Sequence, residues 1–369
     1  MTGSTETGWR ERSLDQQVKA LDRERAFVSC PAPLDAGGLG RHLREILDAH
    51  ERAGLSNAHL CTSSELLPPL TASGRVRSAA TTPLARVSRA WRMWSLSVDF
   101  DERAARAVPT DAGEVIAFNG TAGTQFQAAQ ARAKDARLTL VSANSHYDTV
   151  IERHALAHRQ YPVERPWVTH LRKRNLREYA TASRILYSSS YIRDSFLAQG
   201  VAEEKLVAFP LTPHPRYVPR VAPAGEEFEI VYVGSLTVHK GVPLLLDALS
   251  RLRHDDIRLV LVGGWGTRGM RRHVERAIAA DPRISVSPGD PRVRFADAHL
   301  CVHPAYEDGF GYAPAEALAS GVPVIVSADT GMKELIDEGR DGVVVPTGDR
   351  DALCEAIEAA YGGRLLDGR

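Results

Sequence analysis

The chain has 369 residues, no net charge at pH 7, 43% hydrophobic residues and 25% charged residues. These values are ordinary for a soluble globular protein that is long enough for two domains. They give no support to nucleic-acid binding, and no apolar run is long enough to cross a bilayer. Residues 1–24 are polar and lack the apolar core of a secretion signal, which favours a cytoplasmic protein.

The four cysteines are scattered along the chain and show no Cys-x-x-Cys spacing for zinc or redox chemistry. Each lies in or beside an apolar segment, which is typical of a reduced cysteine that packs in a core. They are Cys30, Cys61, Cys301 and Cys354. We therefore expect no disulfide and no metal centre built from thiolates.

The chain opens with a polar leader, residues 1–24, in which only a short helix from Leu14 to Leu21 is expected. Residues 26–30 predict the first strand, followed by a turn through Gly37-Gly38-Leu39-Gly40 and a helix over 41–52. Strand, glycine loop and helix in this order are typical of an α/β domain. The glycines do not match G-x-G-x-x-G, so the fingerprint of an NAD-binding enzyme is absent.

Residues 75–108 are basic and aromatic, with Trp91 and Trp94 among arginines. One interpretation is a helix on a membrane surface, which would be a peripheral contact. The other is a solvated helix that buries its tryptophans. We favour the second because three acidic residues between positions 99 and 102 cancel much of the positive charge.

Two predicted strands of the first half, 114–118 and 138–142, end in polar clusters. The first cluster is Asn119-Gly120-Thr121 and the second is Asn144-Ser145-His146. Ligands of parallel α/β sheets collect beyond the carboxyl ends of the strands, so both clusters are predicted to face a ligand. The charged stretch 151–180 that follows predicts a solvated helix face, or alternatively a surface that attracts an anionic acceptor.

A proline-rich stretch with little periodicity separates the two halves of the chain and marks the domain boundary. We expect a first Rossmann-like domain over 25–212, a linker over 213–226 and a second Rossmann-like domain over 227–369. The second domain opens with a continuous apolar run, 228–234, typical of a strand that is buried on both faces. A loop then leads through Ser235 to Lys240 and into the next helix.

The most informative stretch is residues 301–326, which combine an apolar strand, a glycine-rich turn and a helix that Pro314 can open. Asp308 precedes Gly309 and Gly311, whose missing side chains allow a ligand to approach the backbone closely. Glu316 is expected in the first helical turn, beside amide groups that need partners. Amides and two carboxylates separated by seven residues suit a sugar joined to a phosphate.

At these residues the chain resembles glycosyltransferase family 4, the retaining enzymes of the GT-B fold, whose signature is Glu, seven residues, Glu. Asp308 fits the first acid and keeps the spacing, and Glu307 would fit it one residue out of register. The resemblance implies two Rossmann-like doubly wound domains that face a cleft. The first would bind a hydroxyl acceptor that the sequence does not identify, and the second a nucleotide-sugar donor.

The resemblance also implies roles for single residues. Lys240 would stabilise the leaving diphosphate, Asp308 would orient hydroxyls of the donor sugar, and His146 would lie near its C6 hydroxyl. Ser235 stands where the family has an arginine, and Arg268 is our candidate for the missing charge. Further donor-binding residues are implied in both halves: Gly38, Gly234, Gly263, Gly309, Phe310, Gly311, Tyr312 and Glu316.

Asn119 is a weaker candidate for contact with the acceptor, and the sequence does not predict an oligomeric state. Asp99-Phe100-Asp101 matches the metal-binding motif of the single-domain glycosyltransferase fold. Because it lies in an amphipathic stretch, we expect no catalytic metal and no cofactor besides the donor. The alternatives are another GT-B enzyme, such as a phosphorylase or a nucleotide-sugar epimerase, and a non-catalytic partner that binds the nucleotide sugar.

Overall fold

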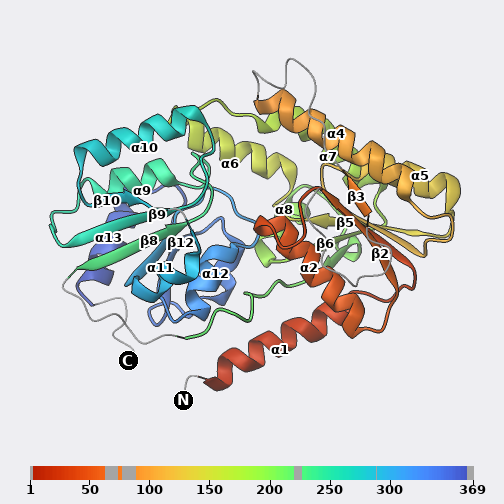
Figure 1. Ribbon diagram of the computed structural model, residues 1–369, viewed down its shortest axis with the longest axis horizontal. Helices are drawn as coiled ribbons and strands as arrows, with labels where there is room; N and C mark the ends of the chain where they lie inside the picture. The colour runs from red at the N-terminus through yellow and green to blue at the C-terminus, as the bar shows by residue number, and fades with distance from the viewer. Residues whose placement is uncertain (1–2, 63–73, 77–88, 220–226, 288, 364–369) are drawn as a thin grey trace. The chain divides into compact units, whose positions relative to one another are not determined.

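The computed structural model describes residues 3–62, 74–76, 89–219, 227–287 and 289–363 (Figure 1). Contacts between residues divide the chain into two compact units. The first consists of Met1–Thr149 and Trp167–Leu211, and the second of Val150–Pro166 and Thr212–Arg369. The second unit therefore includes a segment from the first half of the chain, which the sequence did not predict.

The described part of the first unit contains a parallel sheet of seven strands in the order β3-β2-β1-β4-β5-β6-β7. Its strands are β1 (Ala26–Cys30), β2 (Asn57–Thr62), β3 (Gly74–Val76), β4 (Glu114–Phe118), β5 (Arg137–Ser142), β6 (Arg184–Tyr187) and β7 (Leu206–Ala208). All residues of β1 and β4 are buried, as expected for a parallel sheet covered on both faces.

The helices of the first unit pack against this sheet and against one another, with α4 alongside α5 and α1 on α2 (Figure 1). They are α1 (Gly3–Lys19), α2 (Gly37–Arg52), α4 (Arg89–Ala107), α5 (Gly123–Arg132), α7 (Arg172–Thr181), α8 (Ser190–Ala198) and the 3-10 helices η1 (Val168–Leu171) and η2 (Glu203–Lys205). Helix α6 (Tyr147–Gln160) begins in the first unit and continues in the second.

The second unit contains, within the described residues, a parallel sheet of six strands in the order β10-β9-β8-β11-β12-β13. Its strands are β8 (Phe228–Val233), β9 (Ile257–Val262), β10 (Ile284–Val286), β11 (Leu300–His303), β12 (Val324–Ser327) and β13 (Gly342–Val345). In Figure 1, helices α9 and α10 lie on one side of these strands, and α11 and α12 lie on the other.

The helices of the second unit are α9 (Val242–Leu249), α10 (Arg268–Ala280), α11 (Pro291–Asp297), α12 (Tyr312–Ala319), α13 (Arg350–Tyr361) and the 3-10 helix η3 (Gly331–Leu335). Each unit is thus a doubly wound α/β sheet, which confirms the predicted Rossmann-like pair. The strand order reverses beside β1 and β4 in the first unit and beside β8 and β11 in the second. Ligands of such sheets bind where the order reverses, beyond the carboxyl ends of these strands.

The structure corrects the predicted extent of the first helix. Helix α1 runs from Gly3 to Lys19, and Gln17 anchors it by donating hydrogen bonds to Glu45 Oε2 and Pro210 O, each 2.7 Å long. The predicted leader therefore contains a long, packed helix instead of a short one. Cys30, Cys61 and Cys301 are buried, as predicted, whereas Cys354 is only partly buried.

Candidate active site

The loops that follow β8 and β9 are rich in glycine and are hydrogen-bonded to each other at the carboxyl ends of these two strands. Leu236 N donates to Gly264 O at 2.9 Å, and Gly266 N donates to Leu236 O at 3.1 Å. Gly263 has a φ of 157°, and a Cβ there would lie 1.7 Å from Gly234 O. Only glycine fits such a close approach of two backbones, so Gly234 and Gly263 fix the base of the candidate site.

Lys240 and Asp308 meet where the strand order reverses. Lys240 Nζ lies 2.9 Å from Asp308 Oδ2 and donates a hydrogen bond to Glu307 O at 3.1 Å. His303 Nε2 contacts the same Asp308 oxygen at 2.9 Å. Burial alone would raise the pKa of Asp308, but the ammonium of Lys240 and the hydrogen bond from His303 outweigh it and hold this pKa well below its usual range.

The backbone of Asp308 is held as firmly as its side chain. Asp308 N donates to Asp329 O at 3.1 Å, and Gly331 N donates to Asp308 O at 2.9 Å, which forms a parallel bridge with Thr330. Of the two candidates for the first acid of the signature, Asp308 contacts Lys240 through its carboxylate, and Glu307 contacts it through its backbone carbonyl.

The turn after β11 leads directly into α12. Gly311 precedes the helix with a φ of 88°, and the buried rings of Phe310 and Tyr312 pack edge to face at 5.0 Å. The helix begins at Tyr312 instead of Pro314, so Glu316 is its fifth residue and lies in the second turn, which corrects the prediction. Its side chain is buried.

Ser235 occupies the position at which the family has an arginine, and its side chain carries no charge. Ser235 O accepts a hydrogen bond from Tyr232 OH at 2.9 Å, which fixes the start of the loop. Arg268 is the exposed first residue of α10, directly after the helix cap Thr267. The structure therefore brings Lys240 and Asp308 together, and it places Arg268 at the end of the neighbouring loop.

In the first unit, Gly38 and Asn119 lie beyond the two strands where the order reverses. Gly38 is exposed. It was predicted to lie in a loop, but it is the second residue of α2. Asn119 Nδ2 donates to Asn175 Oδ1 at 3.0 Å, and Asn119 Oδ1 accepts from Ala143 N at 3.3 Å. Half of the hydrogen-bonding capacity of the Asn119 side chain is thus used within the unit.

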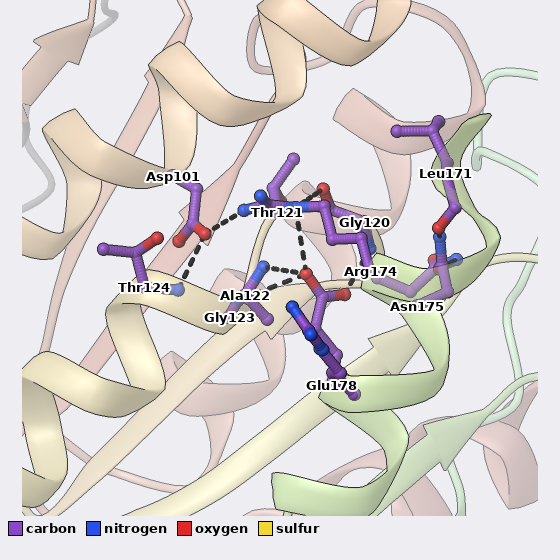
Figure 2. Close-up of polar contacts among 12 residues, drawn as sticks. Asp101, Gly120, Thr121, Ala122, Gly123, Thr124, Leu171, Arg174, Asn175 and Glu178 are labelled. Carbon is purple, nitrogen blue, oxygen red and sulfur yellow. Dashed lines mark hydrogen bonds and ion pairs between the residues drawn. The ribbon is translucent and has the colours of Figure 1, made fainter.

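A buried charge cluster that the sequence did not predict fixes the turn after β4 (Figure 2). Glu178 accepts hydrogen bonds from the backbone N–H groups of Gly120, Ala122 and Gly123 at 2.5, 2.9 and 3.1 Å. Arg174 pairs with both Glu178 and Asp101. Burial raises the pKa of Glu178 to about 7, although Arg174 opposes this shift.

The Asp-x-Asp match has a structural explanation. Asp101 is fully buried and accepts hydrogen bonds from Thr124 N at 2.7 Å and Gln125 N at 3.0 Å, so it caps the start of α5 (Figure 2). The N-terminus of α5 is therefore occupied by the chain's own carboxylates instead of a ligand's phosphate. The prediction of a solvated face over 151–180 is wrong for Arg174, which belongs to this cluster.

His146 lies at the start of α6 and is buried. Its backbone N–H donates to Ser195 Oγ at 2.7 Å, and its ring packs on Tyr179 and Phe196. Asp148 N donates to His146 Nδ1 at 3.3 Å, so the hydrogen of the neutral ring is on Nε2. Burial lowers the pKa of His146, which favours this neutral form.

Trp91 and Trp94 are 39% and 37% exposed and contact each other at 5.6 Å between ring centroids. The favoured interpretation, in which the helix buries them, is therefore wrong. The membrane-surface interpretation stays a prediction, and residues 77–88 of the stretch lie outside the described part of the chain. Among the described helices, none has the length and apolarity needed to span a bilayer.

The comparison with protein families places the candidate site in a known context. Residues 227–362 match the family described as glycosyl transferases group 1. The match contains Lys240, Asp308 and Glu316, and it does not extend to Gly38, Asn119 or His146. The similarity to group 1 glycosyl transferases is thus concentrated in the second unit.

Curated relatives also align with only part of this chain. D-inositol 3-phosphate glycosyltransferase of Corynebacterium kroppenstedtii is 30% identical over 143 residues, which are 35% of this chain and 32% of that protein. The capsular polysaccharide biosynthesis glycosyltransferase CapM of Staphylococcus aureus is 27% identical over 138 residues, 36% of each chain. The chain thus aligns with about a third of the length of these glycosyltransferases.

Solved structures resemble nearly the whole chain. Sucrose-phosphate synthase of Thermosynechococcus elongatus has a TM-score of 0.68 at 19% identity, covering 92% of this chain and 90% of its own. The Anabaena protein HepE, solved in complex with UDP, has a TM-score of 0.62 at 15% identity, covering 92% and 90%. The chain therefore has the two Rossmann-like units of the GT-B fold.

Proposed function

We propose that this chain is a retaining glycosyltransferase of family 4 that moves a sugar from a nucleotide-diphosphate donor to a hydroxyl acceptor. The observation that carries this proposal is the contact between Lys240 and Asp308, 2.9 Å apart, at the reversal point of the second sheet. Two glycine loops border this contact, and the segment that holds it matches the group 1 glycosyl transferases. A cation beside glycine loops suits a diphosphate, and a carboxylate suits sugar hydroxyls.

In the proposed reaction, the bond between the anomeric carbon and the phosphate oxygen breaks, and a bond to the acceptor oxygen forms on the same face. The departing phosphate oxygen takes the proton of the acceptor hydroxyl. Lys240 and the backbone amides stabilise the negative charge that develops on the diphosphate. Asp308 orients donor hydroxyls, Glu316 holds the ribose, and His146 donates from Nε2 to the C6 end of the sugar.

Lys240 can stabilise a leaving diphosphate only if a bound donor changes its present contact with Asp308. In the structure, its ammonium is neutralised by Asp308, which is one methylene shorter than the glutamate of the family signature. A bound diphosphate brings additional negative charge to Lys240, while Asp308 keeps its contact with His303. The same neutralisation, together with Ser235 in place of arginine, favours the alternative of a partner protein that binds a nucleotide sugar without transferring it.

A thermal-stability panel of UDP, GDP and ADP, with their hexose conjugates, tests donor binding. A ligand at a hundred times its dissociation constant stabilises a protein by about 2.7 kcal/mol, which is a shift of several degrees. We expect one nucleotide class to give this shift, and no shift with any of them would contradict the proposal. Binding without release of the nucleoside diphosphate in the presence of acceptors would instead support the non-catalytic partner.

Activity variants test the residue roles. Losing a hydrogen bond to a charged group costs about 1.5–3 kcal/mol, so Lys240→Ala and Glu316→Ala should each lower turnover at least tenfold, as measured by release of the nucleoside diphosphate. Arg271→Ala, which changes an exposed cation of the same unit, is the control. Turnover of Lys240→Ala at the wild-type rate would remove Lys240 from the site.

A further inference from the structure

Residues 150–166 come from the first half of the chain but pack in the second unit. Ala157 is fully buried in the hydrophobic core of that unit. Tyr161 OH donates to Asp247 Oδ2 at 2.9 Å, and Gln160 Nε2 donates to Gly348 O at 3.0 Å. Arg153 Nε lies 3.1 Å from Asp329 Oδ2, in the loop whose backbone pairs with Asp308. The segment is therefore anchored at helix α9 and at the loops after β12 and β13.

Glu164 contacts the backbone of the loop that carries Lys240. Its side chain is only 2% exposed, and its Oε1 accepts a hydrogen bond from Val238 N at 3.2 Å. Val238 is fully buried and precedes Lys240 by two residues. The Lys240 loop, residues 235–240, thus donates one of its backbone hydrogen bonds to a buried carboxyl group that lies far away in sequence.

Two further contacts hold the segment in this unit, one at the Lys240 loop and one at α10. The rings of His154 and His239 stack with their centroids 4.2 Å apart and 19° between their planes. A Cβ on Gly269, near the start of α10, would lie 2.5 Å from Val163 O. Residues 163 and 164 are therefore fitted closely between the Lys240 loop and the start of α10, with little space for the loop to shift.

The Lys240 loop is also restrained by the loop after β11, because Tyr306 N donates a hydrogen bond to His239 O at 2.8 Å. The backbone of residues 238 and 239 is thus held between Glu164 on one side and the loop after β11 on the other. Without Glu164, the buried N–H of Val238 would lose its acceptor, which costs about 1–3 kcal/mol and favours a rearranged loop. A rearrangement at Val238 displaces Lys240 directly.

We propose that Glu164 is a positioning residue that holds the Lys240 loop in the conformation that binds the diphosphate of a nucleotide. This inference depends on the proposed function, because it assigns the loop to a donor diphosphate. It predicts that the side chain acts through the reach and acceptor capacity of Oε1. A glutamine keeps an oxygen at that distance, whereas an aspartate is one methylene short and an alanine has no acceptor.

The experiment measures binding of UDP, GDP and ADP by isothermal titration calorimetry to the full chain and to four variants. Glu164→Ala and Glu164→Asp should raise the dissociation constant about tenfold or more, the change expected when the buried N–H of Val238 loses its acceptor. Glu164→Gln should bind within about threefold of the wild type. Glu152→Ala removes an exposed carboxylate from the same segment, residues 150–166, and should bind as the wild type does.

The pattern of results separates this inference from the proposed function. Wild-type affinity in both Glu164→Ala and Glu164→Asp, or equal weakening in Glu164→Gln, would overturn the positioning role. A wild-type chain that binds none of the three nucleotides would overturn the proposed function and, with it, the inference. If Glu164→Ala does not fold, the contrast between the Asp and Gln variants still decides, because both keep a polar side chain at the site.

Discussion

Lys240 and Asp308 form the ion pair at the centre of the candidate site, and their coupling can be measured without knowing any substrate. Their side chains are 20% and 21% exposed, so both charges are largely removed from water. Replacing one partner should lower the free energy of unfolding by about 1.5–3 kcal/mol, the range for hydrogen bonds to charged groups. For a unit of this size, that loss corresponds to a fall in Tm of about 3–12 °C.

The assay is a double-mutant cycle followed by urea unfolding of Lys240→Met, Asp308→Asn and the double variant. Because the two residues are in contact, the cycle should give a coupling free energy of about 0.5–3 kcal/mol. The control pair is Arg271 and Glu275, which are 59% and 50% exposed on α10 and should couple by less than about 0.5 kcal/mol. Additive effects at Lys240 and Asp308 would refute the reasoning.

The coupling should also depend on pH. The pKa of Asp308 is lowered in the folded chain from an ordinary value of 3.8, so the folded state favours its ionised form. The stability that this carboxylate contributes is therefore present above pH 3.8 and is lost as the pH falls further. The cycle should give a larger coupling at pH 7 than at pH 3, and an equal coupling would contradict the assigned ion pair.

Two further predictions concern the glycine loops and the buried cluster. Gly263→Ala would place a Cβ 1.7 Å from Gly234 O at a φ of 157°, and should lower the free energy of unfolding by about 3 kcal/mol. As the control, a Cβ at Gly264 would meet nothing within 4 Å, so Gly264→Ala should lower the free energy of unfolding by less than about 1 kcal/mol. Burial raises the pKa of Glu178 from 4.5 to about 7, so its contribution to stability should decline as the pH rises from 4.5 to 7. The difference in unfolding free energy between the wild type and Glu178→Gln should fall over this window, and a difference that rises would exclude the assigned shift.

The strands at 26–30 and 114–118 were predicted because each is a compact apolar run between turn residues, and they are β1 and β4. The helix starts were less predictable. Helices α2 and α12 begin after Ala36 and Gly311, neither of which caps the helix with its side chain. Without a Ser, Thr, Asp or Asn at the cap, the sequence gives no local signal, and the start has to follow from the packing of the preceding loop.

The candidate site and its surroundings also include residues whose placement the sequence predicted and residues whose placement it did not. Lys240 and Asp308 belong to loops that follow recognisable strands, so their proximity follows from the order of strands in the sheet. Arg174 was expected to be solvated because its neighbours in sequence are charged, but its partner Asp101 lies 73 residues away. Periodicity identifies which face of a helix is polar, and it does not identify a distant carboxylate that buries that face.

Glu164 shows the consequence of such distant contacts for domain boundaries. The predicted boundary at residues 213–226 follows from proline content, and the match to group 1 glycosyl transferases begins at residue 227. The second unit nevertheless includes residues 150–166, whose Ala157 is buried in its core and whose Glu164 holds the backbone of Val238. A fragment that begins at residue 227 would expose the core around Ala157 and leave the N–H of Val238 without Glu164. The unit that folds around Lys240 is therefore larger than the segment that carries its sequence signature.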